Sequence, residues 1–486
     1  MSLLLDKYAV LAGIGLIGAL WGLVVAAADL NALYLCASLV GCAFILYDFR
    51  AGVILLIVLM PLSGSTVFPH AMFGITGLNP VNLLIAGTLV SYLLRATSDG
   101  SLRRFIPVPL LGLYIAPILL AGAIGTRHLG DIAPTIYVLY EHLDFHDPGS
   151  YLRDMVAKPL LMVVFALLVA AAVAKSEKPE RFLAPALASI WLMAGIVVVF
   201  VLQSGISLGA LASSASREFF SPLGLHANDL GRLFAVAYAL MLFTWAGTQT
   251  PGLKFALLAT AALTVVALTL SFSRGAFVGF VAVNAAFVAW RFNAKTLAVA
   301  CVVLLAGMLL LPDAVYERLA AGQGQGLDAV SAGRVKGLWL PLLPEVLQHP
   351  FFGNGLSSIL WSDAMRGGAG EMVLAVTHPH NAYLEVALDM GITGLLLIGA
   401  YFAQVWGGFR KLAADPGLSP TMRGFFLGGA AGLLSMLLSN LTDSSFVPRT
   451  EHVYLWLAIG VMYGQLAKNA ATAQSAASRA AGDRRW

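Results

Sequence analysis

Long apolar stretches recur along almost the whole chain, and they restrict its fold more than any other feature. Most are long enough to cross the hydrocarbon core of a bilayer as a helix, and they lack the polar–apolar alternation of barrel strands. Only 11% of the residues are charged, whereas soluble domains carry roughly a quarter. The sequence therefore predicts an all-α polytopic integral membrane protein with about 12–14 transmembrane helices.

Fourteen apolar stretches are candidate spans. They cover residues 8–28, 31–47, 51–62, 81–95, 107–124, 158–174, 182–203, 228–246, 254–272, 275–290, 296–312, 382–406, 423–440 and 452–467. We divide the chain accordingly into residues 1–312, with eleven spans and an outer loop near 125–157; a large outer loop, 313–381; three further spans in 382–467; and a tail, 468–486.

The distribution of Lys and Arg over the short loops predicts the orientation of these spans, because basic residues favour the cytoplasmic side. With the N-terminus in the cytoplasm, most of the 29 Lys and Arg fall in inside loops, and an even number of spans returns the Ala/Ser-rich tail to the same side. We expect that tail to be disordered. All nine histidines and both long loops then lie on the outer side.

We expect chemistry in the outer loops, since every inside loop is short and none contains a Walker A pattern. The apolar spacing from Arg334 to Gln348 predicts short amphipathic helices on the outer membrane surface. All three cysteines fall inside apolar stretches, which argues against disulfides and thiolate metal sites. A net charge of +4 without a long basic tract indicates no nucleic-acid partner, and no cofactor is expected.

His380 stands where the large outer loop runs into an apolar helix. Pro379 has no N–H to donate and disfavours helix in the residue before it, so we expect the helix to begin around His380. An imidazole there is a candidate general base near neutral pH, although a helix cap or a headgroup contact is the simpler alternative. His378 could form a metal site with it, but two histidines are weak evidence, and we predict no metal.

Two arginines on the outer side are candidates for binding a diphosphate. Arg274 lies between two spans that meet at the outer surface, and Arg334 opens the helical part of the large loop. A guanidinium offers phosphate oxygens a fixed fork of donors, but Arg274 could equally snorkel to lipid phosphates and Arg334 could be a solvated surface charge. Further outer-side cations are Arg217, Arg153 and Lys158.

Three other polar groups on the outer side have simple interpretations. The stretch Glu141–Asp147 has two histidines at metal-like spacing, but it lacks a third ligand and is better interpreted as a polar loop. Asp443 and Arg449 lie between the last two spans, as expected of a polar turn. Glu385 and Asp389 are one helical turn apart near the outer end of the twelfth span.

Several of these segments together resemble the O-antigen ligase family. His380-Asn381, followed after nine residues by Gly391-Ile392-Thr393-Gly394, is similar to the histidine signature of that family. The preceding loop is similar to it in Gly333-Arg334, in the Arg-x3-Leu pattern from Arg334 to Leu338, and in His349-Pro350-Phe351-Phe352-Gly353-Asn354-Gly355. The segments Ser273-Arg274-Gly275-Ala276 and Thr442-Asp443 also match. The resemblance covers residues 270–450, over a third of the chain.

The resemblance implies a metal-independent glycosyltransferase of the bacterial inner membrane, with its active site facing the periplasm and both termini in the cytoplasm. Members of the family move a glycan from undecaprenyl diphosphate to an acceptor hydroxyl. By resemblance, His380 deprotonates the acceptor, the anomeric configuration inverts, and Arg274 and Arg334 bind the diphosphate. Arg217 is a weaker match, and Arg153 and Lys158 are added from charge and position alone. Asn381, His378 and Asp443 would support the site.

The acceptor distinguishes the members of the family. Ligases use lipid A–core, polymerases of O-antigen or exopolysaccharide use a second lipid-linked glycan, and O-linked oligosaccharyltransferases use protein. We favour the ligase because the histidine signature is intact. Two features depart from the family: fourteen spans exceed the usual twelve, and the 125–157 loop has no counterpart. A flippase or transporter of lipid-linked glycans is the alternative from another class, with Glu385 and Asp389 as candidate mid-membrane groups.

Overall fold

The computed structural model describes residues 13–18, 20–22, 29–99, 105–139, 147–213, 217–294, 326–367, 376–442 and 445–482, together with isolated positions between these ranges. Within this part of the chain, nine helices are long and apolar enough to cross a membrane. The strands found there are β1 (Ala71–Met72) and β2 (Ile75–Thr76), which form one short antiparallel hairpin. The predicted all-α polytopic class is therefore confirmed.

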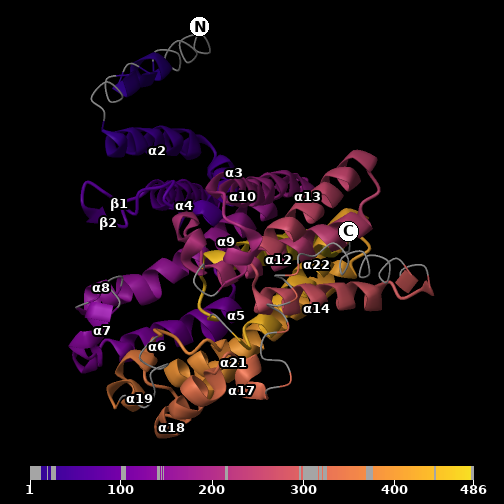
Figure 1. The fold of residues 1–486 in the computed structure, drawn as a ribbon. Helices are drawn as coiled ribbons and strands as arrows, with labels where there is room; N and C mark the ends of the chain where they lie inside the picture. The colour runs from indigo at the N-terminus through magenta and orange to yellow at the C-terminus, as the bar shows by residue number, and fades with distance from the viewer. Residues whose placement is uncertain are drawn as a thin grey trace.

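Helices occupy the predicted spans wherever the structure describes them. They are α2 (Leu30–Tyr47), α3 (Phe49–Leu59), α4 (Pro80–Asp99), α5, η3 and α6 (Val108–Leu110, Leu111–Ile115 and Ala116–Gly125), α9 (Lys158–Ala174), α10 (Leu183–Ser204), α12 (Ala227–Gly247), α13 (Pro251–Leu270), α14 (Arg274–Trp290), α21 (Ala382–Ala413), α22 (Pro420–Ser439) and α23 (Val453–Gly482) (Figure 1). Most of the predicted spans at 296–312 and 8–28 lies outside the described residues. The expectation of a disordered tail from residue 468 is wrong as far as Gly482, because α23 continues as helix to that residue.

The span that contains α9 begins earlier than the sequence indicated. Two short helices, α8 (Pro148–Leu152) and η5 (Arg153–Ala157), run directly into α9 and extend the apolar helix to Pro148–Ala174. Asp147 starts this run, because its carboxylate accepts hydrogen bonds from the backbone N–H groups of the first turn. The loop expected near 125–157 is correspondingly shorter, and both histidines of the Glu141–Asp147 stretch lie outside the described residues.

Two more short elements, η4 (Leu129–Asp131) and α7 (Pro134–Leu139), precede this span. The large loop predicted over 313–381 is also partly helical. It contains α17 (Leu327–Val330), η8 (Val335–Trp339), α18 (Leu340–Gln348), η9 (Ser358–Trp361) and α19 (Asp363–Arg366). The short helices predicted over Arg334–Gln348 are thus present as η8 and α18, and α18 leaves its apolar residues Leu340, Leu343 and Leu347 exposed.

Small residues allow the central helices to approach one another closely. A Cβ atom on Gly424 of α22 would lie 2.4 Å from the carbonyl oxygen of Phe243 on α12. One on Gly460 of α23 would lie 2.5 Å from the carbonyl oxygen of Ala166 on α9. Such close backbone contact is a main source of helix association in membranes, where lipid is as apolar as the helix faces. The pairs α12–α22 and α9–α23 therefore form the centre of the bundle.

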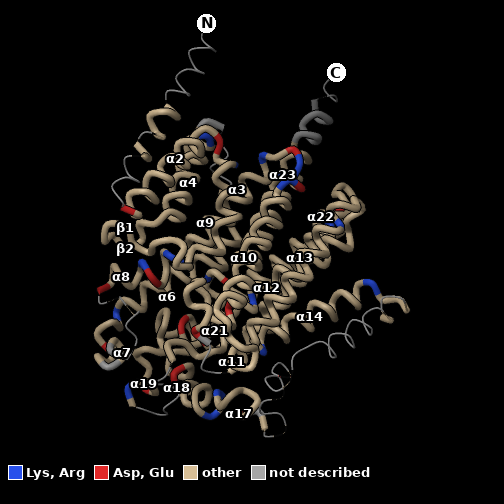
Figure 2. The backbone as a smooth tube through the Cα atoms, turned by 45° about the horizontal axis from the view of Figure 1, so that its top comes forward, with Lys and Arg blue, Asp and Glu red and all other residues tan. Residues whose placement is uncertain are grey.

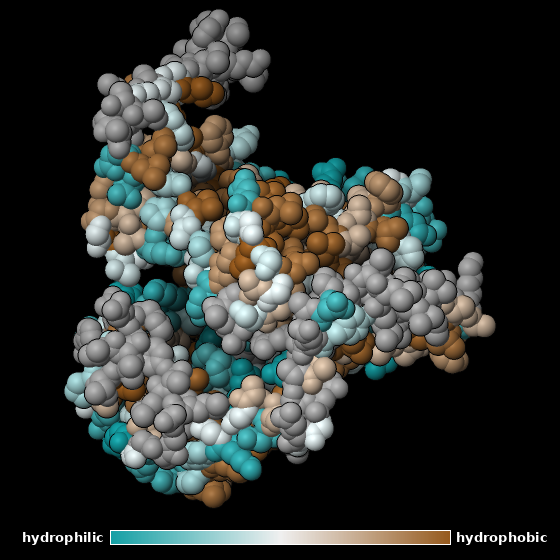
Figure 3. Space-filling model, in the orientation of Figure 1, coloured by the Kyte–Doolittle hydropathy of each residue, from teal (hydrophilic) through white to brown (hydrophobic). Residues whose placement is uncertain are grey.

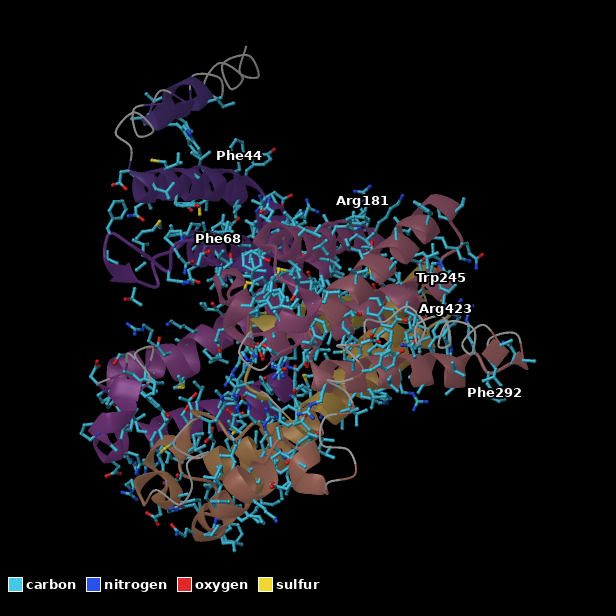
Figure 4. The ribbon with its side chains drawn as sticks, in the orientation of Figure 1. Phe44, Phe68, Arg181, Trp245, Phe292 and Arg423 are labelled. Carbon is cyan, nitrogen blue, oxygen red and sulfur yellow. The ribbon has the colours of Figure 1, made fainter. Side chains whose placement is uncertain are left out.

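The periphery of the bundle is apolar and exposed. Of the apolar 18-residue stretch of α12, 83% is buried, whereas only 11% of the corresponding stretch of α2 is buried. Phe44 projects from α2 and is 61% exposed (Figure 4). Brown apolar surface continues over the neighbouring helices in Figure 3. An outward apolar surface of this kind is what a helix in contact with lipid requires.

The loops predicted to face the cytoplasm gather at one end of the bundle. The side chains that join them are Lys468, which donates to the carbonyl oxygens of Ser176 and Glu177, Asn469, which donates to Asp415, and Ser419, which donates to Glu180. Figure 4 shows Arg181 and Arg423 on the other half of the molecule from α18 and α19. Figure 2 shows most charged residues at helix ends, with a further group beside α8 and α21.

Candidate active site

His380 precedes α21 rather than beginning it. The helix starts at Ala382, and Asn381 is its N-cap, with Oδ1 accepting from the backbone N–H groups of Tyr383 (3.0 Å) and Leu384 (3.1 Å). The expected start around His380 was therefore two residues early, because the side chain of Asn381 supplies the cap. His380 has a φ of 50°, in the left-handed region that non-glycine residues rarely adopt. Its imidazole is presented from a tight turn.

The loop after α22 fixes the start of α21. The backbone N–H of Ala382 donates to the carbonyl oxygen of Asn440 at 3.0 Å. Two residues further on, the carbonyl oxygen of Thr442 accepts a hydrogen bond from the guanidinium of Arg334. Residues 439–442 therefore link Arg334 to the helix that follows His380.

Arg274 approaches the same loop from α14. The hydroxyl of Ser439 donates to the carbonyl oxygen of Gly275, at 3.0 Å. Ser273 caps α14, since its Oγ accepts from the backbone N–H of Ala276 at 3.3 Å, and Arg274 is the first residue of the helix. The positive end of a helix with a guanidinium in its first turn favours anions.

A second contact joins the Arg334 segment to the histidines. Trp339, at the end of η8, donates from Nε1 to the carbonyl oxygen of Pro379 at 2.9 Å. The rings of His378 and His380 lie side by side, with centroids 4.2 Å apart and an interplanar angle of 58°. We call His378, His380, Arg274 and Arg334 the histidine–arginine cluster. All four are half-buried and lie around residues 439–442.

The other predicted site residues lie elsewhere or outside the described part of the chain. Asp443 is not among the described residues, and Arg217 begins η7 (Arg217–Leu223) with a side chain that is not described either. Arg153 and Lys158 are both paired with Asp154, at 3.0 Å and 2.5 Å. The structure thus joins these two cations to a carboxylate on their own helical run.

The glycine signature after His380 marks a break in α21. Gly391 has φ 65° and ψ −166°, which ends one helical segment and begins another within the span. A side chain is excluded there, because a Cβ atom would lie 2.4 Å from the carbonyl carbon of Phe351. The spacing of His380 and Gly391 in the sequence therefore corresponds to a short helical segment. This segment runs from the turn at His380 to the backbone break at Gly391.

The Pro350–Gly355 segment fills this break. Its N–H groups at Asn354 and Gly355 donate to the carbonyl oxygens of Leu388 (2.9 Å) and Asp389 (3.1 Å) of α21. In return, Ile392 N–H donates to Pro350 and Thr393 N–H donates to Phe351, at 2.8 and 3.2 Å. A broken helix in a membrane needs such partners, because an unsatisfied backbone group in hydrocarbon costs several kcal/mol. The histidine–glycine signature and the His349–Gly355 motif are separate in the sequence, but backbone hydrogen bonds hold them together in the structure.

The same loop holds a buried carboxylate. Asp389 is 4% exposed and accepts hydrogen bonds from Ser357 N–H (3.0 Å), Ser358 N–H (3.0 Å) and Ser358 Oγ (2.8 Å). These three hydrogen bonds compensate the carboxylate for the water that it loses on burial. Asp389 thereby fixes the end of the Pro350–Gly355 segment against α21.

A cavity of about 520 Å³, lined by both apolar and polar side chains, borders the start of α21. Its walls come from the β1–β2 hairpin and the start of α4, from η5 and α9, from the first two turns of α21, and from the loop at 445–450. The charged residues in its lining are Asp154, Lys158, Glu385, Asp389 and Arg449. We call this space the carboxylate cavity. It is large enough for a small organic ligand or a few sugar rings.

Glu385 is the least satisfied group in the carboxylate cavity. Its Oε1 lies 3.7 Å from the Arg449 guanidinium, an ion pair longer than a hydrogen bond, and the side chain of Ser445 also interacts with this carboxyl group. Its Oε2 is buried and accepts no hydrogen bond from the described residues. Leaving a buried acceptor without a donor costs about 1–3 kcal/mol. Desolvation lowers the pKa of Arg449, but Glu385 and Glu451 raise it above its ordinary value, so this guanidinium stays cationic.

A buried ion network behind this cavity was not expected from the sequence. Arg232 on α12 is 3% exposed and pairs with Asp229 and, at 3.4 Å, with Glu451. The signal was present, because an arginine and an aspartate three residues apart inside a predicted span are rare and costly. Among the described residues, no group of three or more His, Cys, Asp or Glu side chains is placed to hold a metal ion.

Together, the fold and the site define a polytopic all-α membrane protein with one broken span and a histidine–arginine cluster at one end of the bundle. Residues 259–399 match the family model described as O-antigen ligase, and this segment contains Arg274, Arg334, His380 and Gly391. A curated O-antigen ligase of Pseudomonas aeruginosa is 28% identical over 169 residues, 34% of this chain and 36% of that protein. Through this segment the chain is similar to the O-antigen ligase family, and the match spans about a third of the length of that relative.

Proposed function

We propose that this protein transfers a glycan from undecaprenyl diphosphate to an acceptor hydroxyl, and that it acts as an O-antigen ligase with lipid A–core as acceptor. The family match supports the reaction class. The observation that carries the proposal is the convergence of Arg274, Arg334 and the His380 turn on residues 439–442. Those residue types at one place suit a reaction in which an alcohol loses a proton while a diphosphate departs.

In the proposed reaction, His380 accepts the proton of the acceptor hydroxyl. Histidine is the side chain best suited to proton transfer near neutral pH. The acceptor oxygen forms a new bond to the anomeric carbon as the bond from that carbon to the diphosphate oxygen breaks. The electron pair of the broken bond stays with undecaprenyl diphosphate. Attack from the side opposite the leaving group inverts the anomeric configuration.

Arg274 and Arg334 would stabilise the charge that develops on the diphosphate. A guanidinium binds phosphate oxygens with two parallel N–H donors, and the N-terminus of α14 adds to the favourable potential. Arg217 is proposed as a third donor contact. His378 and Asn381 support the position of His380, the first through ring contact and the second as the cap of α21. The proposed chemistry uses no metal and no nucleotide.

The proposed location is the inner membrane of a bacterium, with the histidine–arginine cluster facing the periplasm and both termini in the cytoplasm. The grouping of Lys- and Arg-rich loops at the opposite end of the bundle supports this orientation. A lipid-linked donor could then reach the cluster from the outer leaflet.

A transporter of lipid-linked glycans is the second candidate, because one observation favours it. The span α21 is broken at Gly391 and carries Glu385 and Asp389, and discontinuous helices with ionisable groups are common in transporters. The predicted product separates the two candidates, since a transporter moves its substrate without cleaving it.

One reconstitution experiment tests the proposal. Purified protein in liposomes is given an undecaprenyl-diphosphate-linked glycan with lipid A–core, with a second lipid-linked glycan, or with neither. Release of undecaprenyl diphosphate together with glycosylated lipid A–core is the expected result. Elongation of the lipid-linked glycan instead identifies a polymerase. Movement of the donor across the bilayer without release contradicts the proposed transferase.

A further inference from the structure

The carboxylate cavity is open to the outside and built from distant parts of the chain. Figure 3 shows a hollow with a hydrophilic wall between the hairpin side of the molecule and the side of α6 and α8. The hairpin contributes His70 and Thr76 to the lining, and α9 contributes Lys158. Asn79, Asn82, Ser63, Ser357, Ser445 and Thr450 add neutral polar groups. A lining that mixes amides, hydroxyls and both charges suits a ligand rich in hydroxyl groups.

The charges in the lining disfavour a diphosphate. Three carboxylates, those of Asp154, Glu385 and Asp389, face two cations, Lys158 and Arg449. Lys158 is already paired with Asp154, and Arg449 is paired with Glu385. A diphosphate in this space would therefore find both cations already engaged with carboxyl groups of the protein. The anionic end of a lipid-linked donor therefore belongs at the histidine–arginine cluster and not in this cavity.

Two shared elements connect the carboxylate cavity to His380. The first is α21, which begins two residues after His380 and places Glu385 in its first turn. The second is the loop after α22, which contacts Arg334 through Thr442 and lines the cavity with Ser445 and Arg449. A ligand in the cavity thus lies next to the first turn of α21, which follows directly after the tight turn that presents the imidazole.

Within this space, Glu385 supplies an acceptor that the protein itself does not satisfy. Its Oε2 is buried without a hydrogen-bond donor among the described residues, and the residue lines the cavity. A sugar hydroxyl is a donor of the right kind, because it can give one hydrogen bond to a carboxylate and accept others from Asn or Lys side chains. The vacant acceptor is what distinguishes this cavity from a space that merely holds water.

We infer that the carboxylate cavity binds the glycan of the acceptor and that Glu385 is a specificity-determining contact to one of its hydroxyls. This inference rests on the proposed function. In an inverting displacement the nucleophile and the leaving group occupy opposite sides of the anomeric carbon, so acceptor and diphosphate require separate sites. The histidine–arginine cluster supplies one site and the cavity supplies the other.

A steric variant tests the inference without removing any charge. Thr76 is an exposed residue of β2 that lines the cavity, and Ile75 is its exposed neighbour outside the lining. Successive residues of a strand point to opposite faces, so Ile75→Trp is a matched control for Thr76→Trp. In the reconstituted assay with lipid A–core, Thr76→Trp should raise the acceptor KM about tenfold, while the donor KM and the kcat at saturating acceptor stay within about twofold of wild type.

Glu385→Gln tests the hydroxyl contact itself. It should raise the acceptor KM about tenfold, because an amide keeps the shape of the carboxylate but weakens the hydrogen bond that it accepts. Asp363→Asn, at an exposed position outside the cavity, is the control and should change no parameter.

The results separate this inference from the proposed function. If the wild-type protein transfers glycan but both Thr76→Trp and Glu385→Gln leave the acceptor KM unchanged, the acceptor does not bind here. If the donor KM rises instead, the cavity holds the donor glycan and the inference is wrong. If the wild-type protein transfers glycan to no acceptor, the proposed function itself fails.

Discussion

Two regions meet at the start of α21, and their charges differ. On one side, the histidine–arginine cluster places two guanidinium groups and two imidazoles around residues 439–442. On the other side, the carboxylate cavity contains three acidic side chains and only two cations, both already paired. Both regions are built on the same helix start and on the same loop after α22.

This difference indicates how one short helix can serve two substrates. Guanidinium groups such as those of the cluster suit an anionic leaving group, whereas a hydroxyl-rich lining whose cations are already paired suits an uncharged glycan. Between the two regions, the imidazole of His380 would accept the proton of the acceptor hydroxyl. The comparison therefore predicts that substitutions on the two sides affect different kinetic parameters.

The largest expected effect follows from removal of the base. His380→Ala should lower the turnover of glycan transfer by about 100-fold or more, because a positioned general base contributes about 10²–10⁴ in rate. Donor binding should remain, since the arginines are intact. The measurement is single-turnover transfer in liposomes, together with binding of undecaprenyl diphosphate.

His378→Ala is the matched control for this substitution. Its ring lies 4.2 Å from that of His380, so a loss of less than tenfold is expected if His378 only supports its neighbour. Wild-type turnover by His380→Ala, or equal losses in both variants, would contradict the assignment of His380 as the base.

Arg274→Lys should produce the next largest effect. Lysine keeps the charge but loses the fork of donors, so kcat/KM should fall about 10- to 100-fold. Arg291→Lys, at the opposite end of α14, is the control and should have little effect. Full activity of Arg274→Lys would support the simpler interpretation, in which Arg274 snorkels to lipid phosphates.

Gly391→Ala tests the junction between the two regions. The new Cβ atom would lie 2.4 Å from the Phe351 carbonyl carbon, in a backbone conformation open essentially to glycine alone. The variant should lose about 1–3 kcal/mol of stability, seen as a lower unfolding temperature in detergent. Gly399→Ala, in the same helix with open space around it, is the control. An unchanged unfolding temperature would mean that the break is not required.

The smallest effect is expected for Arg153→Ala. Arg153 was predicted as a donor contact, but Asp154 already pairs with it at 3.0 Å, and it lies outside the histidine–arginine cluster. Transfer should change less than about threefold, as is usual for the loss of a partly exposed pair. A loss of transfer as large as that of Arg274→Lys would instead indicate that Arg153 binds the diphosphate. The proposed difference between the two regions would then be wrong.

Hydropathy predicted the spans well because lipid leaves little choice of structure to an apolar stretch. The main displacement occurred at α9, where Arg153, Asp154 and Lys158 interrupt the apolar pattern although both cations pair with Asp154 within the helix. Motif reasoning identified His380, Arg274 and Arg334 as one group, and the structure brings their segments together on residues 439–442.

Features that depend on tertiary contact could not be predicted in the same way. The Pro350–Gly355 segment was known only as a motif, since nothing local indicates that its backbone pairs with a broken helix. The cavity is lined from Met60 to Thr450, and no local pattern joins segments so far apart. Arg232 was overlooked although a buried cation in a span is a strong signal, and its partner Glu451 lies more than two hundred residues away.

The break in α21 has a consequence for biogenesis. A continuous span satisfies its own backbone as it leaves the ribosome, but α21 depends on four hydrogen bonds with a segment of the preceding outer loop. In the proposed orientation, that loop must cross the membrane and fold before the span behind it can mature. The turn that presents His380, and the cavity beside it, therefore take shape only in a finished molecule. Under the proposed function, an immature chain in the membrane would therefore be unable to cleave the lipid-linked donor.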